Sequence, residues 1–133
     1  MSSTETARPR AIVIGHGDFA KGMVSAVDRI TGQGSALLAL SVQDRSLVQI
    51  ESWLRENLGE TAAQVVFTDL QAGSASMAAR KALRDLPGVV LVVGANLPML
   101  LDFVLSASTS PVEAATHAAE RGRAAITVHG GAA

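Results

Sequence analysis

The stretch Ala11-Ile12-Val13-Ile14-Gly15-His16-Gly17-Asp18-Phe19-Ala20 decides the fold class of this chain. Its first four residues are apolar and mostly β-branched, which predicts a short buried strand. The Gly-His-Gly that follows predicts a turn into a helix, and glycines on both sides leave open space around the imidazole. In an open α/β sheet, ligands and chemistry gather beyond the carboxyl ends of the strands. His16 is therefore the first candidate for a reactive group.

Strand-like and helix-like segments alternate through the rest of the sequence. Short apolar runs predict further strands at 36–40, 65–68 and 89–93, and a last short strand at 126–128. Apolar residues at helical spacing predict helices near 21–30, 47–58 and 74–86, a helix from about 97, and a last one from about 111 to 122. This alternation predicts an α/β fold with a doubly wound, mostly parallel sheet and helices on both faces.

Three local signals refine this prediction. Asp44 is placed to cap the helix at 47–58, and Ser110-Pro111-Val112-Glu113 resembles a capping box for the last helix. The valine-rich run at 89–93 is typical of a strand covered on both faces, so we expect it to be central in the sheet.

Length and composition exclude several classes of protein. With 133 residues, 48% of them hydrophobic, the chain has the size of one domain with a substantial core. Its 11 Lys and Arg nearly balance 12 Asp and Glu, and only 3% of residues are aromatic, which argues against nucleic-acid binding. The sequence has no cysteine, which excludes disulfides, a thiolate nucleophile and a cysteine-ligated zinc site.

The two ends of the chain are polar or small in composition. Residues 1–10 contain no apolar core of a secretory signal, so we expect a disordered arm there, one domain over 11–129 and a flexible tail at 130–133. The longest apolar stretch, 88–105, is interrupted by Asn96, Pro98 and Asp102, whereas a membrane span needs about 20 predominantly apolar residues. We expect a soluble, cytoplasmic protein.

A second group of polar residues is expected at the same sheet edge as His16. Asp69 follows the predicted strand 65–68 and can accept a hydrogen bond from the imidazole if that strand neighbours the first one. A nucleophilic histidine needs one ring nitrogen tied up as a donor and the other deprotonated. Gly73 and Ser74 stand at a helix N-terminus, which favours an anion. Together these residues suggest phosphoryl transfer through a phosphohistidine.

Simpler roles exist for each of these residues. His16 can be an ordinary turn residue, and Asp69 and Ser74 can be plain helix caps. The glycines near His16 imitate a dinucleotide fingerprint only loosely, because their spacing is wrong. His117 and His129 are most simply structural or exposed, and the three scattered histidines do not have the spacing of a metal site, so no metal and no cofactor are expected.

Three motifs give the chain a family resemblance from about residue 11 to 128: Ile14-Gly15-His16-Gly17-Asp18-Phe19-Ala20, Phe67-Thr68-Asp69-Leu70-Gln71-Ala72-Gly73-Ser74 and Gly94-Ala95-Asn96-Leu97-Pro98-Met99-Leu100. With these motifs the chain resembles the enzyme IIA domain (type 4) of the mannose family of the phosphoenolpyruvate-dependent sugar phosphotransferase system, in particular its N-acetylgalactosamine branch. The resemblance implies a doubly wound α/β homodimer whose last strand, antiparallel to the others, is exchanged or paired across the subunits.

The resemblance also implies residue roles and partners. His16 matches the histidine that is phosphorylated on Nε2, Asp69 the aspartate that holds the opposite nitrogen, and Ser74, next to Gly73, a serine near the phosphoryl group. The phosphoryl donor is then the carrier protein HPr, the acceptor is the enzyme IIB component, and the association with a membrane sugar permease is indirect.

The chain departs from the common family pattern, and other functions remain open. Ala72 and Ala75 stand where the second motif usually has glycine and proline, and Gly15 stands where some relatives have threonine. One alternative is a regulatory phosphohistidine module, or the related phosphoryl-donor subunit of dihydroxyacetone kinase. The other is a small-molecule-binding α/β domain without a phosphohistidine.

Overall fold

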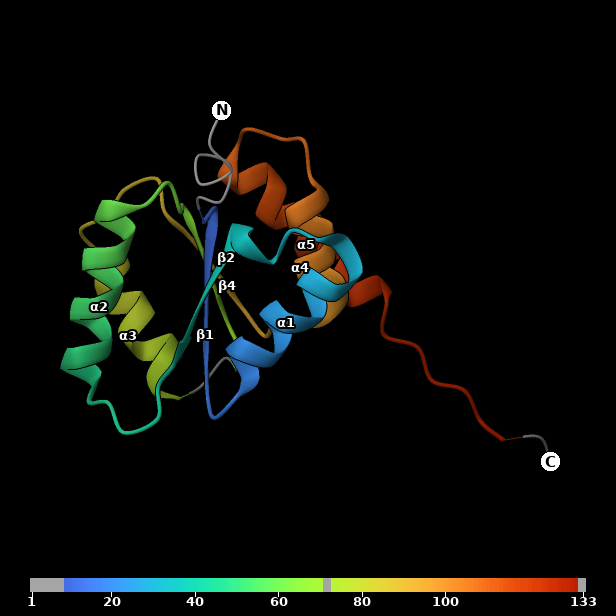
Figure 1. Ribbon diagram of the computed structural model, residues 1–133, viewed down its shortest axis with the longest axis horizontal. Coiled ribbons are helices and arrows are strands. Elements are labelled where there is room, and N and C mark those ends of the chain that lie inside the picture. The colour runs from blue at the N-terminus through green and yellow to red at the C-terminus, as the bar shows by residue number, and fades with distance from the viewer. Residues whose placement is uncertain (1–8, 71–72, 132–133) are drawn as a thin grey trace.

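The computed structural model describes residues 9–70 and 73–131, and over these residues four strands form one parallel sheet (Figure 1). β1 (Ala11–Gly15) pairs with β2 (Leu37–Ser41) on one side and with β3 (Val65–Thr68) on the other. β3 then pairs with β4 (Val90–Val93), which gives the order β2-β1-β3-β4. Helical crossovers return the chain to the same end of the sheet each time, so all the pairings are parallel.

Helices cover both faces of the sheet. On one face lie α2 (Leu47–Glu60) and α3 (Ser74–Leu83), and on the other lie α1 (Phe19–Thr31), α4 (Leu97–Leu105) and α5 (Pro111–Ala124) (Figure 1). A 3₁₀ turn, η2 (Gly34–Ala36), precedes β2. The predicted α/β, doubly wound parallel fold is confirmed.

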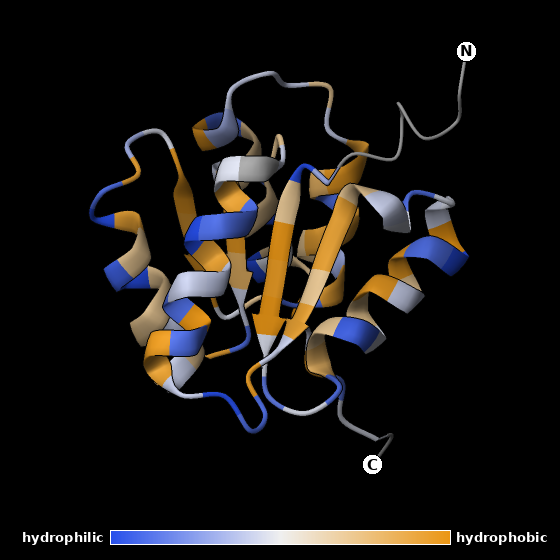
Figure 2. Ribbon diagram, turned by 60° about the vertical axis from the view of Figure 1, so that its left-hand side comes forward, coloured by the Kyte–Doolittle hydropathy of each residue, from blue (hydrophilic) through white to orange (hydrophobic). Residues whose placement is uncertain are grey.

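The pleat of the strands sorts their side chains between two cores. In β1, Ala11 and Val13 pack toward α1, α4 and α5, while Ile12 and Ile14 pack toward α2 and α3. All four are fully buried, which matches a strand that is covered on both faces. Figure 2 shows apolar residues along the strands, whereas hydrophilic residues gather on loops and on helix surfaces.

The start of α2 differs from the prediction. Asp44 does not cap the helix: it has a φ of 60° and lies two residues before the cap, so that prediction is wrong. Ser46 is the N-cap instead, accepting a hydrogen bond from the Gln49 N–H at 3.2 Å while the Gln49 side chain accepts from the Ser46 N–H at 2.8 Å. This reciprocal pair satisfies two N–H groups, which one aspartate cannot do alone.

The start of α5 follows the predicted pattern only in part. Ser110 accepts a hydrogen bond from the Glu113 N–H at 3.2 Å and Pro111 occupies the first turn, as expected. The Glu113 carboxylate, however, accepts from the Ser108 hydroxyl at 3.3 Å, and Ser108 also accepts from the Ser110 N–H. Because Ser108 takes the place that a reciprocal capping box would use, only the serine half of the box forms.

Helix ends lie within a few residues of the predicted ones. α1 begins two residues earlier than predicted, and α5 continues to Ala124. α3 ends at Leu83 rather than at Leu86. Hydrogen bonds of turn type, such as Leu86 N–H to Leu83 carbonyl, replace the helical pattern there, because Pro87 disfavours helical backbone in the residue before it.

Two predictions about the far edge of the sheet are wrong for the single chain. β4 lies at the edge and not in the centre, and its four residues are only partly buried. Residues 126–131 contain no strand and run away from the domain (Figure 1), leaving Ile126 and Val128 exposed. A strand needs a neighbour for its backbone N–H and C=O groups, and the tail has none within the described chain.

Candidate active site

Sheet register brings His16 and Asp69 together. β1 and β3 are neighbours, with Ile14 paired to Thr68, so both chains leave the sheet side by side at its carboxyl edge. His16 follows β1 and its carbonyl accepts a hydrogen bond from the Phe19 N–H at 3.0 Å, which closes the turn into α1. Asp69 follows β3 directly, as the sequence predicts.

The Asp69 carboxylate binds the histidine through two donors. Its Oδ2 accepts a hydrogen bond from the His16 N–H at 2.8 Å and lies 2.8 Å from the imidazole Nδ1. Its Oδ1 accepts from the Leu70 N–H at 2.9 Å. Because an ionised carboxylate can only accept, Nδ1 carries a proton, and the lone pair of the neutral ring lies on Nε2. The contact therefore selects the tautomer that a nucleophilic Nε2 needs.

Burial and hydrogen bonding have opposite effects on Asp69. The Asp69 side chain is 10% exposed, whereas that of His16 is 50% exposed. Burial alone would raise the pKa of Asp69, but the hydrogen bonds from the His16 backbone and ring, and the charge interaction with the ring, outweigh it and lower the pKa. Asp69 is consequently a carboxylate at neutral pH, beside a ring that is open to a partner.

Two glycines allow this close approach. A Cβ on Gly15 would lie 2.6 Å from a ring carbon of Phe19 and 2.9 Å from the Asp69 carboxylate, so the position requires glycine. Gly73 has a φ of 109°, which favours glycine, and a Cβ there would lie 3.1 Å from Cε1 and 3.6 Å from Nε2 of His16. The structure thus places the backbone of Gly73 against the ring edge that includes the free nitrogen.

The N-terminus of α3 lies beside that ring edge. Gly73 is the N-cap and Ser74, partly exposed, is the first helical residue, so Ser74 is not the N-cap that the simpler alternative describes. The first N–H groups of a helix have no partner within it and attract an anion. Ala75, one of the two departures from the family pattern, is a fully buried residue of α3, and Ala72 lies outside the described residues.

The third sequence motif, residues 94–100, contacts the backbone next to Asp69. The N–H groups of Gly94 and Ala95 both donate to the Thr68 carbonyl, at 3.0 and 2.9 Å. Asn96 caps α4 by accepting from the Met99 N–H at 3.1 Å, and it donates to the Gly122 carbonyl of α5 at 3.0 Å. This motif therefore fixes the peptide just before Asp69 and joins α4 to α5.

Sequence reasoning missed two buried hydroxyl groups next to Asp69. Thr68 and Ser76 are fully buried, and their hydroxyl oxygens lie 2.9 Å apart. The carbonyl of Leu70 accepts from the Ser76 hydroxyl and lies 3.3 Å from the Thr68 hydroxyl. The position of Ser76 in the sequence does not distinguish it from Ser74. The one signal is that Ser76 is a polar residue inside an alanine-rich helix.

The other histidines lie outside this cluster. His117 in α5 has its Nδ1 2.7 Å from Asp102 of α4, and His129 contacts the Thr127 hydroxyl at 3.1 Å. Both histidines are exposed. Within residues 9–70 and 73–131, no three histidine or acidic side chains gather into a metal-binding group.

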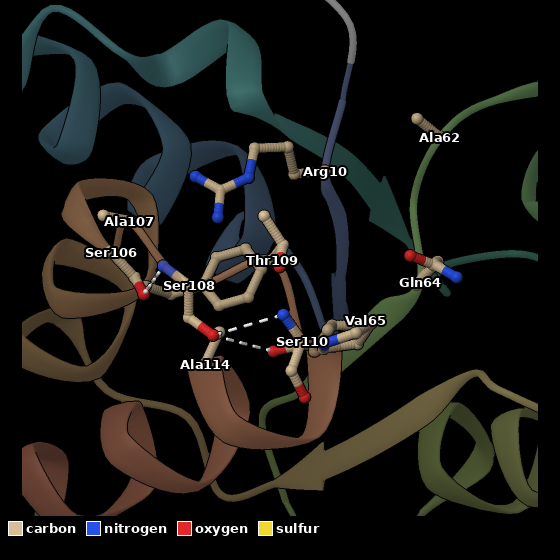
Figure 3. Close-up of a pocket in the computed structure, with 12 residues that line it drawn as sticks. Arg10, Ala62, Gln64, Val65, Ser106, Ala107, Ser108, Thr109, Ser110 and Ala114 are labelled. Atoms are coloured by element: carbon tan, nitrogen blue, oxygen red, sulfur yellow. Dashed lines mark hydrogen bonds between the residues drawn. The ribbon is translucent and has the colours of Figure 1, made fainter.

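A cavity of about 370 Å³ lies at the opposite, amino end of the strands (Figure 3). Arg10 lines it, but its guanidinium stacks on Phe103 at 5.0 Å and donates to the Val104 carbonyl at 3.3 Å. The Ser108 hydroxyl contacts the backbone of Ser110 on both its N–H and C=O, as the dashed lines in Figure 3 show. The polar groups of Arg10 and Ser108 are thus already engaged within the protein.

Solved structures share this fold over nearly the whole chain. The mannose/sorbose-specific IIA subunit of the phosphotransferase system from Enterococcus faecalis is 24% identical, with a TM-score of 0.80 over 95% of this chain and 98% of that one. The phosphotransferase component EIIA from Streptococcus agalactiae is 20% identical, with a TM-score of 0.80 over 90% and 95%. The IIA protein associated with the fucose utilization operon of Streptococcus pneumoniae is 22% identical, with a TM-score of 0.76 over 91% and 93%.

The fold is that of IIA components of sugar phosphotransferase systems. The family described as the phosphotransferase system fructose IIA component, EIIA-man, matches residues 10–120, and the chain belongs to this family. No curated protein sequence matches the chain. Its role is therefore that of a phosphotransferase component in sugar uptake, which confirms the resemblance to the mannose family. Over the described residues, no helix has the length and apolar character of a membrane span.

Proposed function

We propose that His16 is the phosphorylated residue of a cytoplasmic phosphoryl relay. The observation that carries the proposal is the pairing of Nδ1 with Asp69 at 2.8 Å, on a ring that is half exposed. The Nε2 lone pair attacks the phosphorus of a donor phosphohistidine, and an N–P bond forms as the donor's N–P bond breaks. The donor nitrogen keeps the electron pair, and the proton on His16 Nδ1 remains in its hydrogen bond to Asp69.

The surrounding groups stabilise the charges of this step. The ring becomes cationic as Nε2 takes the phosphoryl group, and the buried Asp69 carboxylate compensates that charge. Backbone N–H groups at the start of α3, with Ser74, face the equatorial oxygens, because Gly73 lies against the ring edge next to Nε2. The exposed ring suits a carrier, since the next protein must reach the same phosphorus.

The proposed partners rest on the family of the chain. We propose that the carrier protein HPr donates the phosphoryl group and that an enzyme IIB component accepts it, so that contact with a membrane sugar permease is indirect. The family membership of residues 10–120 supports this assignment. The sugar itself is recognised elsewhere, in the membrane component of such a system.

We further propose a homodimer in which residues 126–131 of one subunit pair with β4 of the other. The free edge of β4 supports this arrangement, because its unpaired backbone groups attract another strand. A groove of about 390 Å³ follows this edge between β4 and α5, lined by residues that include Val90, Val92, Ala115 and Ala119. Ile126 and Val128 are exposed apolar side chains that alternate as in a strand.

Phosphorylation in vitro tests the relay. The protein is incubated with phosphoenolpyruvate, enzyme I and HPr, and the product is mapped by mass spectrometry under alkaline conditions. We expect one acid-labile phosphate on His16. The matched control is His117→Ala, which removes the other aspartate-paired histidine and should leave phosphorylation unchanged. Acid-labile phosphate on His16→Ala would overturn the proposal.

Addition of the IIB component separates the alternatives. Loss of phosphate from the protein and its gain by IIB support a transport relay. Stable phosphorylation without onward transfer favours a regulatory module. No phosphorylation at all, with a small molecule retained through purification, favours the binding-domain alternative.

A further inference from the structure

The loop that carries Asp69 rests on a pair of buried hydroxyl groups. Thr68 is the last residue of β3 and Ser76 lies in the first turn of α3, and both side chains are fully buried. Their hydroxyl oxygens are 2.9 Å apart, 8 residues from one another in sequence. A buried hydroxyl without a partner costs about 1–3 kcal/mol, so such a pair is retained only where its hydrogen bonds are satisfied.

The hydroxyl protons of Thr68 and Ser76 both have an acceptor. Ser76 donates to the Leu70 carbonyl. Thr68 donates either to the Ser76 oxygen or to the same Leu70 carbonyl, which lies 3.3 Å away. The two hydroxyls therefore form a short chain that ends on the carbonyl of Leu70, the residue after Asp69.

The residues on both sides of Asp69 are held by hydrogen bonds. The Leu70 N–H donates to Asp69 Oδ1 at 2.9 Å, while the Leu70 carbonyl is held by the hydroxyl pair. On the other side, the Thr68 carbonyl accepts from the N–H groups of Gly94 and Ala95. The residues on either side of the carboxylate that contacts His16 Nδ1 are thus held by hydrogen bonds at the Thr68 carbonyl, the Leu70 N–H and the Leu70 carbonyl.

Simple packing does not account for the two hydroxyls. The other buried side chains of α3 are alanines, and serine is a poorer helix former than alanine. Valine has nearly the shape of threonine and would suit the interior of a parallel strand better. A positioning role explains why polar side chains stand at these two buried positions.

We propose that Thr68 and Ser76 are positioning residues for phosphoryl transfer. They hold the Asp69 carboxylate against Nδ1 of His16 and tie the start of α3 to the end of β3, which keeps Gly73 against the ring edge at Nε2. A displacement of about 1 Å in such a site can reduce a rate by about a hundredfold. The inference rests on the proposed function of His16, but its first test does not need a phosphoryl donor.

The first test reads the histidine tautomer directly. Imidazole ¹⁵N NMR spectra are recorded for the wild type, Thr68→Val, Ser76→Ala and the double variant. We expect the wild-type His16 to be locked with its proton on Nδ1 and the double variant to show a mixture of tautomers. Each single variant should change less, because the remaining hydroxyl still reaches the Leu70 carbonyl. Thr68→Ser keeps the hydroxyl, so its spectrum should match that of the wild type.

The second test measures the rate of phosphate uptake from phospho-HPr. We expect the double variant to be slower by about tenfold or more, within the range for a sub-ångström displacement of a reacting group. Ser110→Ala is the matched control, because it also removes a serine hydroxyl that bonds the backbone near a helix start, but at α5 and not at α3. It should lower the unfolding temperature without changing the rate or the tautomer.

The outcomes are distinguishable. A purely structural role predicts that the variants lose thermal stability while the His16 tautomer and the uptake rate stay as in the wild type, and this result would overturn the inference. If the double variant does not fold, Thr68→Val, which keeps the shape of the side chain, decides the question through the same spectrum. Failure of the wild type to take up phosphate would overturn the proposed function alone, because the spectra still report on positioning.

Discussion

Replacement of Asp69 by asparagine tests the centre of the proposed site. The carboxylate accepts three hydrogen bonds, from the His16 N–H and ring on Oδ2 and from the Leu70 N–H on Oδ1. An amide has one oxygen and one NH₂ group, so in either orientation it places a donor against a donor. With the oxygen toward His16 the NH₂ faces Leu70, and with the oxygen toward Leu70 the NH₂ faces His16.

The structure sets the size of the effect. One unsatisfied buried group costs about 1–3 kcal/mol, and a hydrogen bond to a charged group contributes about 1.5–3 kcal/mol. The loss of charge compensation in the transition state therefore raises the barrier by about 3 kcal/mol. Since about 1.4 kcal/mol corresponds to a factor of ten in rate, we expect Asp69→Asn to slow phosphorylation by about 10²-fold.

The assay is rapid-quench transfer of labelled phosphate from phospho-HPr to the protein under single-turnover conditions. Asp102→Asn is the matched control, because Asp102 of α4 lies 2.7 Å from Nδ1 of His117 in α5, a pair of the same kind outside the His16 site. Circular dichroism confirms that both variants are folded. A rate for Asp69→Asn within twofold of the wild type, in a folded protein, would refute the role of Asp69.

Three further predictions follow from the same contacts. A Cβ at position 15 would collide with Phe19 and with the Asp69 carboxylate, so we expect Gly15→Ala to slow phosphorylation and to lose about 1–3 kcal/mol of unfolding free energy in a urea titration. An unchanged stability would contradict this steric argument. Asn96→Ala removes a helix cap and should cost about 1 kcal/mol, read from the same titration, while uptake falls by less than in Gly15→Ala. Because the pKa of Asp69 is lowered in the folded state, its stabilising contribution is present above the ordinary value of about 3.9 and is lost as the pH falls through the folded pKa. As the pH falls from about 5 through the folded pKa, the wild type should therefore lose more unfolding free energy than Asp69→Asn. Parallel plots of unfolding free energy against pH for the two proteins would exclude a favourable contact of the ionised Asp69.

The sequence predicted the elements well because their signals are local. A run of β-branched residues such as 11–14 has few alternatives to a buried strand, and Pro111 after Ser110 marks a helix start through its own backbone chemistry. The placement of His16 and Asp69 at one sheet edge also follows from local order, because parallel strands share a carboxyl end. The contact between them needs only that β1 and β3 be neighbours, which the structure confirms.

The errors arose where an outcome depends on neighbours that are distant in sequence. A valine-rich strand indicates apolar surroundings, but β4 obtains them from one strand and from helices, and its other edge stays open. Residues 126–128 have the composition of a strand, and a strand exists only where another backbone accepts its hydrogen bonds. Asp44 has the right residue type for a cap, yet Ser46 lies at the right backbone position.

By itself, the sequence determined the α/β alternation, the candidate histidine and the aspartate that follows the third strand, because periodicity and residue chemistry act over a few positions. Only the tertiary structure decided the tautomer of His16, which depends on a 2.8 Å contact across 53 residues of chain. It also decided that Gly15 must be glycine and that Thr68 and Ser76 share hydrogen bonds beneath Asp69. These features depend on distances between side chains that meet only when β1, β3 and α3 are packed together, and no pattern along the chain encodes such distances.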